Sequence, residues 1–265
     1  MTAAISLNGL PTQWFDRGSI DAKLLLCLHP LGQNGTFFDG LFAALGDGWR
    51  VISFDQRGHG SAAAHPVRDF SQFVDDAEAA LDRIGGKAHV AGFSLGGSIA
   101  AELASRRADD IPTLTLAATP HQGMPVFAER ACAVRMGSIA AIADETVRRW
   151  FGRLDGDPAI LVARASLDQL SPESFDAAWR AFATFEGYGK FAGRLPPALC
   201  LSFSQDLSTP PTIADQIADA ITTAGGEAHR VDISGAGHMG LLQKPAEVAS
   251  ALAEFITRYH EEVTP

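Results

Sequence analysis

Short apolar runs and helix-spaced apolar positions alternate along most of the chain. Continuous apolar runs are typical of strands that are buried on both faces of a sheet. They lie at Lys23–Pro30, Arg50–Asp55, His89–Phe93, Pro112–Thr119 and Ala198–Phe203. Ala228–Ile233 is predicted as the last strand. The intervening helical patterns lie at Phe37–Leu45, Phe70–Ile84, Ser94–Arg107, Pro211–Thr223 and Ala246–Tyr259. Alternation of this kind predicts an α/β fold with a mostly parallel central sheet flanked by helices.

Two segments do not follow this alternation of strand and helix patterns. The N-terminal stretch Ile5–Phe15 predicts an antiparallel hairpin strand at one edge of the sheet. Between Gly123 and Gly193 no buried strand run is present, and the pattern is helical. The helices expected there are Phe127–Ile142, Asp144–Phe151, Ala159–Leu167 and Phe175–Phe185. We therefore expect a core formed by residues 1–122 and 194–265, with a helical cap inserted at residues 123–193.

The pentapeptide Gly92–Gly96 (GFSLG) stands between a predicted strand and a predicted helix. A sharp strand-to-helix turn of this composition holds its serine in a strained conformation at the carboxyl end of the sheet. An ordinary glycine-rich turn could have the same sequence. The predicted strand before it and the predicted helix after it favour a nucleophile elbow. Ser94 is therefore the candidate nucleophile.

A serine hydroxyl needs a neighbouring base to act as a nucleophile. His238 lies in the glycine-rich stretch Gly235–Gly240, directly after the last predicted strand. Asp206 follows the penultimate strand, where its carboxylate could accept a hydrogen bond from the imidazole and fix its tautomer. The alternative role of Asp206 is to cap the next helix. We expect Thr209 to supply that cap, which favours the catalytic role for Asp206.

Acyl transfer also requires N–H donors for the developing oxyanion. One should be the N–H of Leu95, directly after the nucleophile. The other should come from the loop His29–Gly35, where Pro30 has no N–H and Leu31 is the better donor. We expect the polar residues of the next loop, Asp55–Gly60, to support this oxyanion loop by hydrogen bonds rather than to take part in catalysis.

These motifs together resemble the α/β-hydrolase superfamily. The matching stretches are His29–Gly35 (HPLGQNG), Asp55–Gly60 (DQRGHG), Gly92–Gly97 (GFSLGG), the acid before Thr209–Pro211, and Gly235–His238 (GAGH). Within the superfamily the chain is most similar to 3-oxoadipate enol-lactonase-like enzymes. That likeness lies in the pair Phe37–Phe38 after the oxyanion loop and in the cap stretches Ala133–Gly137 and Arg149–Phe151. The resemblance implies a serine hydrolase that cleaves a small carboxylic ester or lactone through an acyl-enzyme on Ser94.

Residues of the cap and of the loops around the nucleophile are the candidates for substrate contact. They are Phe93, His121, Met124, Phe127, Trp150, Phe151, Trp179 and Met239. Five cap arginines could place one cation over a carboxylated substrate, although any single arginine is more often on a solvated face. These are Arg130, Arg135, Arg148, Arg149 and Arg153.

The composition limits the partners. A net charge of −10 over 265 residues disfavours nucleic acid and anionic membranes as partners. No signal peptide or membrane-length apolar run is present, so we expect a cytoplasmic protein. The three cysteines have no disulfide or zinc spacing, and no metal or cofactor is expected. A homodimer remains open.

Three other activities are compatible with the same residues. They are cofactor-free perhydrolysis or haloperoxidase-like chemistry, hydrolysis of a carbon–carbon bond, and ligand reception by a hydrolase fold. Activity with peroxide and halide would identify the first. Turnover far faster than ligand exchange would exclude the receptor.

Overall fold

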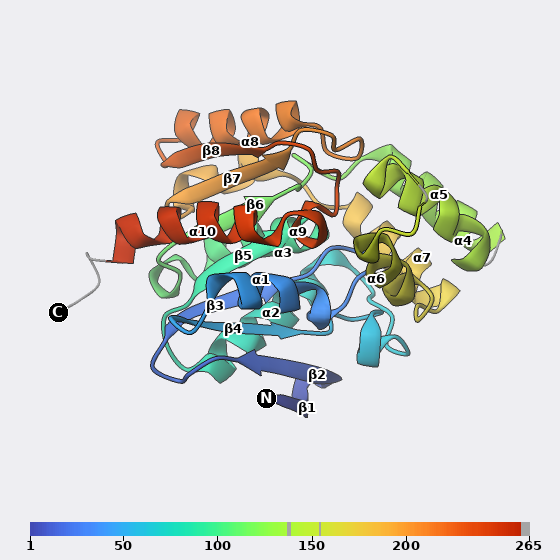
Figure 1. Cartoon of the computed structure of the whole chain (residues 1–265), viewed down its shortest axis with the longest axis horizontal. Coiled ribbons are helices and arrows are strands. Elements are labelled where there is room, and N and C mark those ends of the chain that lie inside the picture. The colour runs from blue at the N-terminus through green and yellow to red at the C-terminus, as the bar shows by residue number, and fades with distance from the viewer. Residues whose placement is uncertain (137–138, 154, 261–265) are drawn as a thin grey trace.

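The computed structural model describes residues 1–136, 139–153 and 155–260, and in that part of the chain a single eight-stranded sheet forms the centre (Figure 1). The strand order is β1-β2-β4-β3-β5-β6-β7-β8. The β1–β2 and β2–β4 pairs are antiparallel, and every other pair is parallel. The strands are β1 Thr2–Leu7, β2 Leu10–Arg17, β3 Lys23–Leu28, β4 Trp49–Phe54, β5 His89–Phe93, β6 Leu114–Ala117, β7 Ala198–Phe203 and β8 Ala228–Ile233. The predicted α/β-hydrolase fold class is confirmed.

The N-terminal hairpin has two strands where the sequence indicated one. Asn8 and Gly9 join β1 to β2, with φ of 46° and 73°. Positive φ at both central residues is what a tight two-residue hairpin turn requires, and the Asn-Gly pair adopts it readily. The antiparallel edge is therefore fixed by a local turn.

Helices cover both faces of the sheet. Figure 1 shows α1 and α10 in front of the sheet and α2 and α3 behind it. The α-helices outside the cap are α1 Asp39–Leu45, α2 Phe70–Ile84, α3 Leu95–Arg106, α8 Pro211–Thr223, α9 Gly240–Gln243 and α10 Pro245–His260. Short 3-10 helices are η1 Gly35–Phe38, η2 Gly60–Ala62, η3 Ala108–Asp110, η4 Tyr188–Lys190 and η5 Ala192–Arg194. The first two residues of the predicted helix Phe37–Leu45 belong to η1, and α1 begins at Asp39. The 3-10 turn starts early because the Asn34 side chain accepts the Thr36 N–H (3.0 Å).

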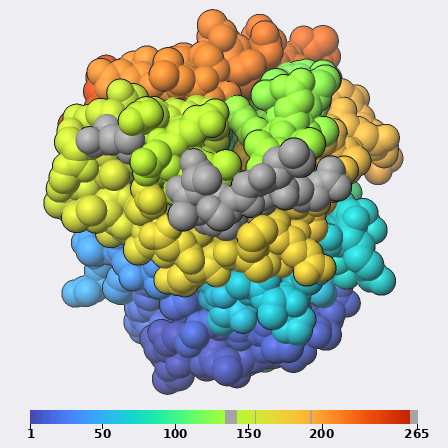
Figure 2. Space-filling model, turned by 90° about the vertical axis from the view of Figure 1, so that its right-hand side faces the viewer, coloured from blue at the N-terminus to red at the C-terminus, as the bar shows by residue number. Residues whose placement is uncertain are grey.

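Within the described residues four α-helices lie between β6 and β7, and we call them the cap. They are α4 Pro125–Met136, α5 Ile139–Phe151, α6 Pro158–Leu167 and α7 Pro172–Ala183. In Figure 1 they stand together at the right-hand end of the sheet, and Figure 2 shows the same green and yellow segments spread across that end of the molecule. The predicted helix Phe127–Ile142 runs across residues 137 and 138, which lie outside the described residues. The predicted start of α7 at Phe175 is too late, because Ser171 caps the helix and Pro172 opens it.

Candidate active site

The turn between β5 and α3 holds Ser94 in a strained backbone conformation. Its φ is 51° and its ψ is −115°, a region that costs a non-glycine residue about 1–3 kcal/mol. The turn is tight enough that glycines are required beside it. A Cβ on Gly92 would collide with the Gly96 carbonyl, and one on Gly96 would collide with the Leu28 carbonyl. The packing of backbone on backbone therefore maintains the strain at Ser94.

The Ser94 hydroxyl is directed at a histidine rather than at its own helix. Ser94 occupies the N-cap position of α3, but its side chain makes no capping hydrogen bond. Its Oγ lies 3.0 Å from His238 Nε2, and His238 Nδ1 lies 2.8 Å from Asp206 Oδ2. All three side chains are buried. The structure thus brings together the three residues that the sequence singled out, from loops that follow β5, β7 and β8.

Asp206 is fixed by donors other than the histidine. Its Oδ1 accepts the Ser208 N–H (2.7 Å) and the Thr209 N–H (3.0 Å), and its Oδ2 accepts the Thr209 hydroxyl (2.7 Å). Burial alone would raise the pKa of Asp206, but the charge and hydrogen bond of His238 and the donors from Thr209 hold that pKa below its usual value. A carboxylate that stays ionised at this position keeps the Nδ1–H tautomer of His238 and leaves Nε2 free to accept the serine proton.

The expectation that Thr209 caps α8 is wrong. Pro210 occupies the N-cap position and makes no side-chain cap. The Thr209 hydroxyl faces Asp206 instead, and it also lies 3.3 Å from His238 Nδ1. Thr209 therefore belongs to the site, and Asp206 caps the turn before the helix rather than the helix itself.

Two backbone N–H groups near Ser94 are available as donors. Within the described residues the N–H of the buried Leu31 makes no hydrogen bond. Leu95 is the first residue of α3, so its N–H has no acceptor within the helix. The partial positive charge at the start of a helix favours an anion there.

His29 fixes the peptide that carries the Leu31 N–H. Its Nδ1–H donates to the Pro30 carbonyl (3.0 Å), while its Nε2 accepts the Gln56 N–H (3.0 Å). Burial holds the pKa of His29 well below its ordinary value, so this pattern of one donor and one acceptor persists. In a trans peptide the C=O and N–H point in opposite directions. Holding the Pro30 carbonyl therefore directs the Leu31 N–H away from His29.

The loop after β4 supports the oxyanion loop, as the sequence indicated. Asp55 accepts the Gly35 N–H through Oδ1 and the Ser61 N–H through Oδ2, both at 2.8 Å. The ring of His59 lies 5.1 Å from that of His29, edge to face, and both rings are buried. Neither Asp55 nor His59 lines the cavity at Ser94.

The cap is hydrogen-bonded to both halves of the site. Gln33 of the oxyanion loop donates to the Ala163 carbonyl of α6 (3.2 Å). The N–H of His238 donates to the Trp150 carbonyl at the end of α5 (2.7 Å). The positions of the oxyanion loop and of the histidine loop therefore both depend on the docked cap.

A small cavity of about 20 Å³ lies above the serine, under the cap. It is lined by Leu31, Ser94, Pro120, Phe127, Arg130, Arg149, Trp150, Trp179, Phe182, Ser208, Thr209 and His238. Of the candidate substrate contacts, Trp150, Phe127 and Trp179 lie on it.

Other candidates lie elsewhere. Phe93 packs against Phe37 and Phe38, with ring centroids 5.6 and 5.8 Å away. His121 lines a separate surface cavity, and Met239 is buried at the start of α9. Met124 and Phe151 are also absent from the lining of the Ser94 cavity. Side chains next to the triad in sequence thus point into the core, because neighbouring residues of a strand or turn face opposite sides.

Among the five cap arginines, the structure separates two from the rest. Arg130 and Arg149 line the Ser94 cavity, whereas Arg148 is exposed and Arg153 pairs with Asp157. The side chain of Arg135 lies outside the described residues. The sequence offered no signal for this division, because it depends on which face of each helix packs onto the core.

No group of three or more His, Cys, Asp or Glu side chains suited to a metal ion is found in the part of the chain that the structure describes. In the same residues no helix is long and apolar enough to cross a membrane.

Residues 25–251 match the model of the alpha/beta hydrolase family, and the chain belongs to that family. It is 29% identical over 185 residues to a proline iminopeptidase of Pestalotiopsis fici, a match that covers 67% of this chain and 66% of that protein. It is 24% identical over 248 residues to a 3-oxoadipate enol-lactonase of Acinetobacter baylyi, covering 90% of each. The fold superposes with a TM-score of 0.86 on a malate-bound esterase of Thermogutta terrifontis, at 25% identity over 98% of this chain and 99% of that one. The expectation of an α/β-hydrolase enzyme is confirmed.

Proposed function

We propose that this enzyme is a serine hydrolase that cleaves small carboxylic esters or lactones through an acyl-enzyme on Ser94. The observation that carries the proposal is the chain of hydrogen bonds from Ser94 through His238 to Asp206, with the serine held at φ 51° beside a cavity. This arrangement combines a nucleophile, a base within hydrogen-bond distance and a carboxylate that orients the base.

In the first step Ser94 Oγ attacks the carbonyl carbon while His238 Nε2 takes the hydroxyl proton. The carbonyl oxygen becomes an oxyanion, which the N–H groups of Leu31 and Leu95 stabilise. Asp206 stabilises the imidazolium, which then gives its proton to the leaving alkoxide. In a lactone that alkoxide remains attached to the acyl group. Water, deprotonated by His238, then attacks the acyl-enzyme, and His238 returns the proton to Ser94 Oγ as the acid leaves.

The size of the cavity indicates how substrate enters. A space of about 20 Å³ holds roughly one water molecule. Because Trp150, Trp179 and Phe127 form much of its wall, those side chains must move to admit an ester. We therefore expect these cap side chains to move apart on binding, and the substrate to be small.

The relatives support ester and lactone substrates over amine-terminated peptides. Of the three similar proteins named above, one is an enol-lactonase, one is an esterase and one is an iminopeptidase. An aminopeptidase substrate carries a cationic amine next to its scissile bond. The Ser94 cavity is lined by two arginines and, within the described residues, by no carboxylate. Its electrostatics therefore disfavour the amine.

The test is steady-state hydrolysis of short p-nitrophenyl esters, an enol-lactone and simple lactones by the wild type and by Ser94→Ala. We expect the variant to lose at least about four orders of magnitude in kcat. Ser105→Ala, on the same helix and away from the cavity, is the control. If Ser94→Ala keeps its turnover, the acyl-enzyme is refuted. Halide oxidation by wild type with peroxide, without ester hydrolysis, would favour perhydrolysis instead.

We also propose that the protein works in the cytoplasm. Its cysteines are unpaired, with Cys27 and Cys200 buried and Cys132 exposed. Free thiols are typical of a reducing compartment.

A further inference from the structure

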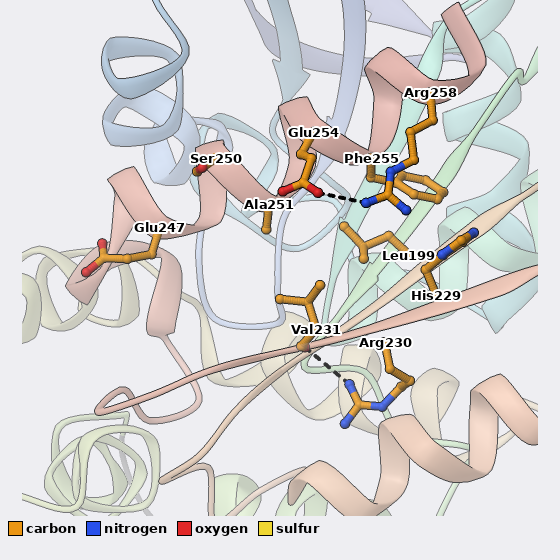
Figure 3. Close-up of a pocket in the computed structure, with 10 residues that line it drawn as sticks. All are labelled: Leu199, His229, Arg230, Val231, Glu247, Ser250, Ala251, Glu254, Phe255 and Arg258. Carbon is orange, nitrogen blue, oxygen red and sulfur yellow. Dashed lines mark hydrogen bonds and ion pairs between the residues drawn. The ribbon is translucent and has the colours of Figure 1, made fainter.

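Arginine side chains line both the Ser94 cavity and a second, larger cavity, and the two cavities differ in how those arginines are satisfied. The larger, of about 390 Å³, lies between β8 and α10 (Figure 3). There Arg258 pairs with Glu254 (2.7 Å), and Arg230 pairs with Asp215 (2.7 Å) and donates to the Val231 carbonyl (3.2 Å). The protein itself neutralises these cations, so nothing there calls for an anionic ligand.

The arginines above Ser94 lack such partners. Within the described residues neither Arg130 nor Arg149 forms an ion pair, and the Nε of Arg149 is buried without any hydrogen-bond partner. Arg130 lies over the rings of Trp179 (5.0 Å) and Phe127 (5.6 Å), which orient it without accepting its hydrogen bonds. A buried charged donor without a hydrogen-bond partner is costly in free energy, and an anionic ligand would satisfy it here.

The charges around the pair favour an anion in the Ser94 cavity. Glu145 is a carboxylate that influences both arginines, and Glu129 influences Arg130. Both arginines also line an adjoining cavity of about 40 Å³ together with Glu145, but neither carboxylate lines the cavity at Ser94. Burial, and after it the charge of Arg130, lowers the pKa of Arg149 to about 10. Two like charges held close to each other are relieved by an anion bound between them.

We propose that Arg130 and Arg149 bind a carboxylate group of the substrate, so that the enzyme acts on esters or lactones that carry a free carboxylate. Both arginines line the same cavity as the Ser94 nucleophile. The reacting carbonyl and the carboxylate must therefore belong to one small molecule, such as the half-ester of a short dicarboxylic acid or a carboxylated lactone. The planar guanidinium matches a carboxylate through two parallel hydrogen bonds. This inference rests on the proposed ester hydrolysis.

The first measurement compares matched substrates on the wild-type enzyme. Monomethyl succinate, glutarate and adipate are compared with the methyl esters of the corresponding monoamides, which have the same shape and no charge. A charged hydrogen bond contributes about 1.5–3 kcal/mol, so kcat/KM should favour the carboxylate by about 10- to 100-fold at the chain length that fits. Equal or better turnover of the amides would overturn the proposal.

The second measurement uses Arg149→Gln and Arg130→Gln, with the exposed neighbour Arg148→Gln as the matched control. The carboxylate-to-amide ratio of kcat/KM should fall at least about tenfold in the first two variants and stay unchanged in the control. Identical ratios in Arg149→Gln and Arg148→Gln would overturn the assignment.

Measuring dicarboxylate binding to an inactive variant tests the carboxylate subsite independently of ester hydrolysis. Calorimetry with glutarate on the inactive Ser94→Ala protein should detect binding that Arg149→Gln abolishes in the double variant. If the wild-type enzyme binds glutarate but hydrolyses no ester or lactone, the proposed function alone is refuted. Hydrolysis of neutral p-nitrophenyl esters without any carboxylate preference or dicarboxylate binding would refute the carboxylate subsite alone.

Discussion

The buried histidine behind the oxyanion loop should make the fold sensitive to acid. His59 is fully buried, its Nδ1–H donates to the Arg57 carbonyl (2.8 Å), and its Nε2 has no hydrogen-bond partner among the residues that the structure describes. Burial lowers the pKa of His59 from 6.5 to about 4. Between these two values the unfolded chain carries a proton on this ring and the folded protein does not. Protons therefore favour unfolding, and stability falls as the pH falls from 6.5 to 4.

The size of the effect follows from the shift. Each unit of pKa corresponds to about 1.4 kcal/mol, so the change at His59 amounts to about 3 kcal/mol of unfolding free energy. His59→Asn keeps a donor near the Arg57 carbonyl and removes the titration. The variant should be less stable than wild type at pH 7.5, because the ring leaves a void. Its stability should nevertheless fall less steeply with acid.

The assay is urea unfolding of both proteins at several pH values from 7.5 to 4. The carboxylates make the same contribution to the pH dependence of the unfolding free energy in both proteins. That contribution therefore cancels when the two stability curves are subtracted. We expect the stability difference between wild type and variant to shrink by about 3 kcal/mol across this range. Parallel curves would show that His59 does not remain neutral in the fold, and the reasoning would fail.

Three further predictions concern the site. Thr209→Val removes the hydroxyl that donates to Asp206 and should lower kcat about tenfold with KM unchanged, measured with a p-nitrophenyl ester; an unchanged kcat would show that the hydroxyl is dispensable. Gly96→Ala places a Cβ against the carbonyl at the end of β3 and should cost at least about 3 kcal/mol in urea unfolding, whereas Gly86→Ala, with open space around it, should cost little; equal effects would contradict this. His29→Gln cannot hold the oxyanion-loop carbonyl and should lose about 100-fold in kcat, while His29→Asn, whose amide can replace Nδ1–H, should keep most of it; equal losses would refute the positioning role.

The buried strands and the catalytic loops could be predicted because their signals are local. The strand His89–Phe93 and the helix Phe70–Ile84 have the predicted bounds, the helix because Gly85 ends it at a φ of 74°. A strand buried on both faces shows as an unbroken apolar run whatever surrounds it. The elbow motif likewise needs only its own glycines to form the turn.

The environment of individual side chains could not be predicted in the same way. Trp150 and Phe93 are both apolar residues near the site, and only the docking of the cap places one of them on the cavity. Arg149 and Arg148 are adjacent in sequence, yet one is half-buried beside Ser94 and the other is exposed. Threonine is a residue type that often caps a helix, which made Thr209 a candidate cap. In the folded protein its hydroxyl instead donates to Asp206, a contact that the residue type does not indicate.

The central claim is that Ser94 forms the covalent intermediate, and titration with a p-nitrophenyl phosphonate tests it most directly. The phosphonate should bind one equivalent per chain, abolish ester hydrolysis in proportion to labelling, and appear by peptide mass analysis on Ser94. His238→Ala should react far more slowly, because the serine then lacks its base. Full labelling at another residue, or hydrolysis that persists in the fully labelled enzyme, would contradict the account.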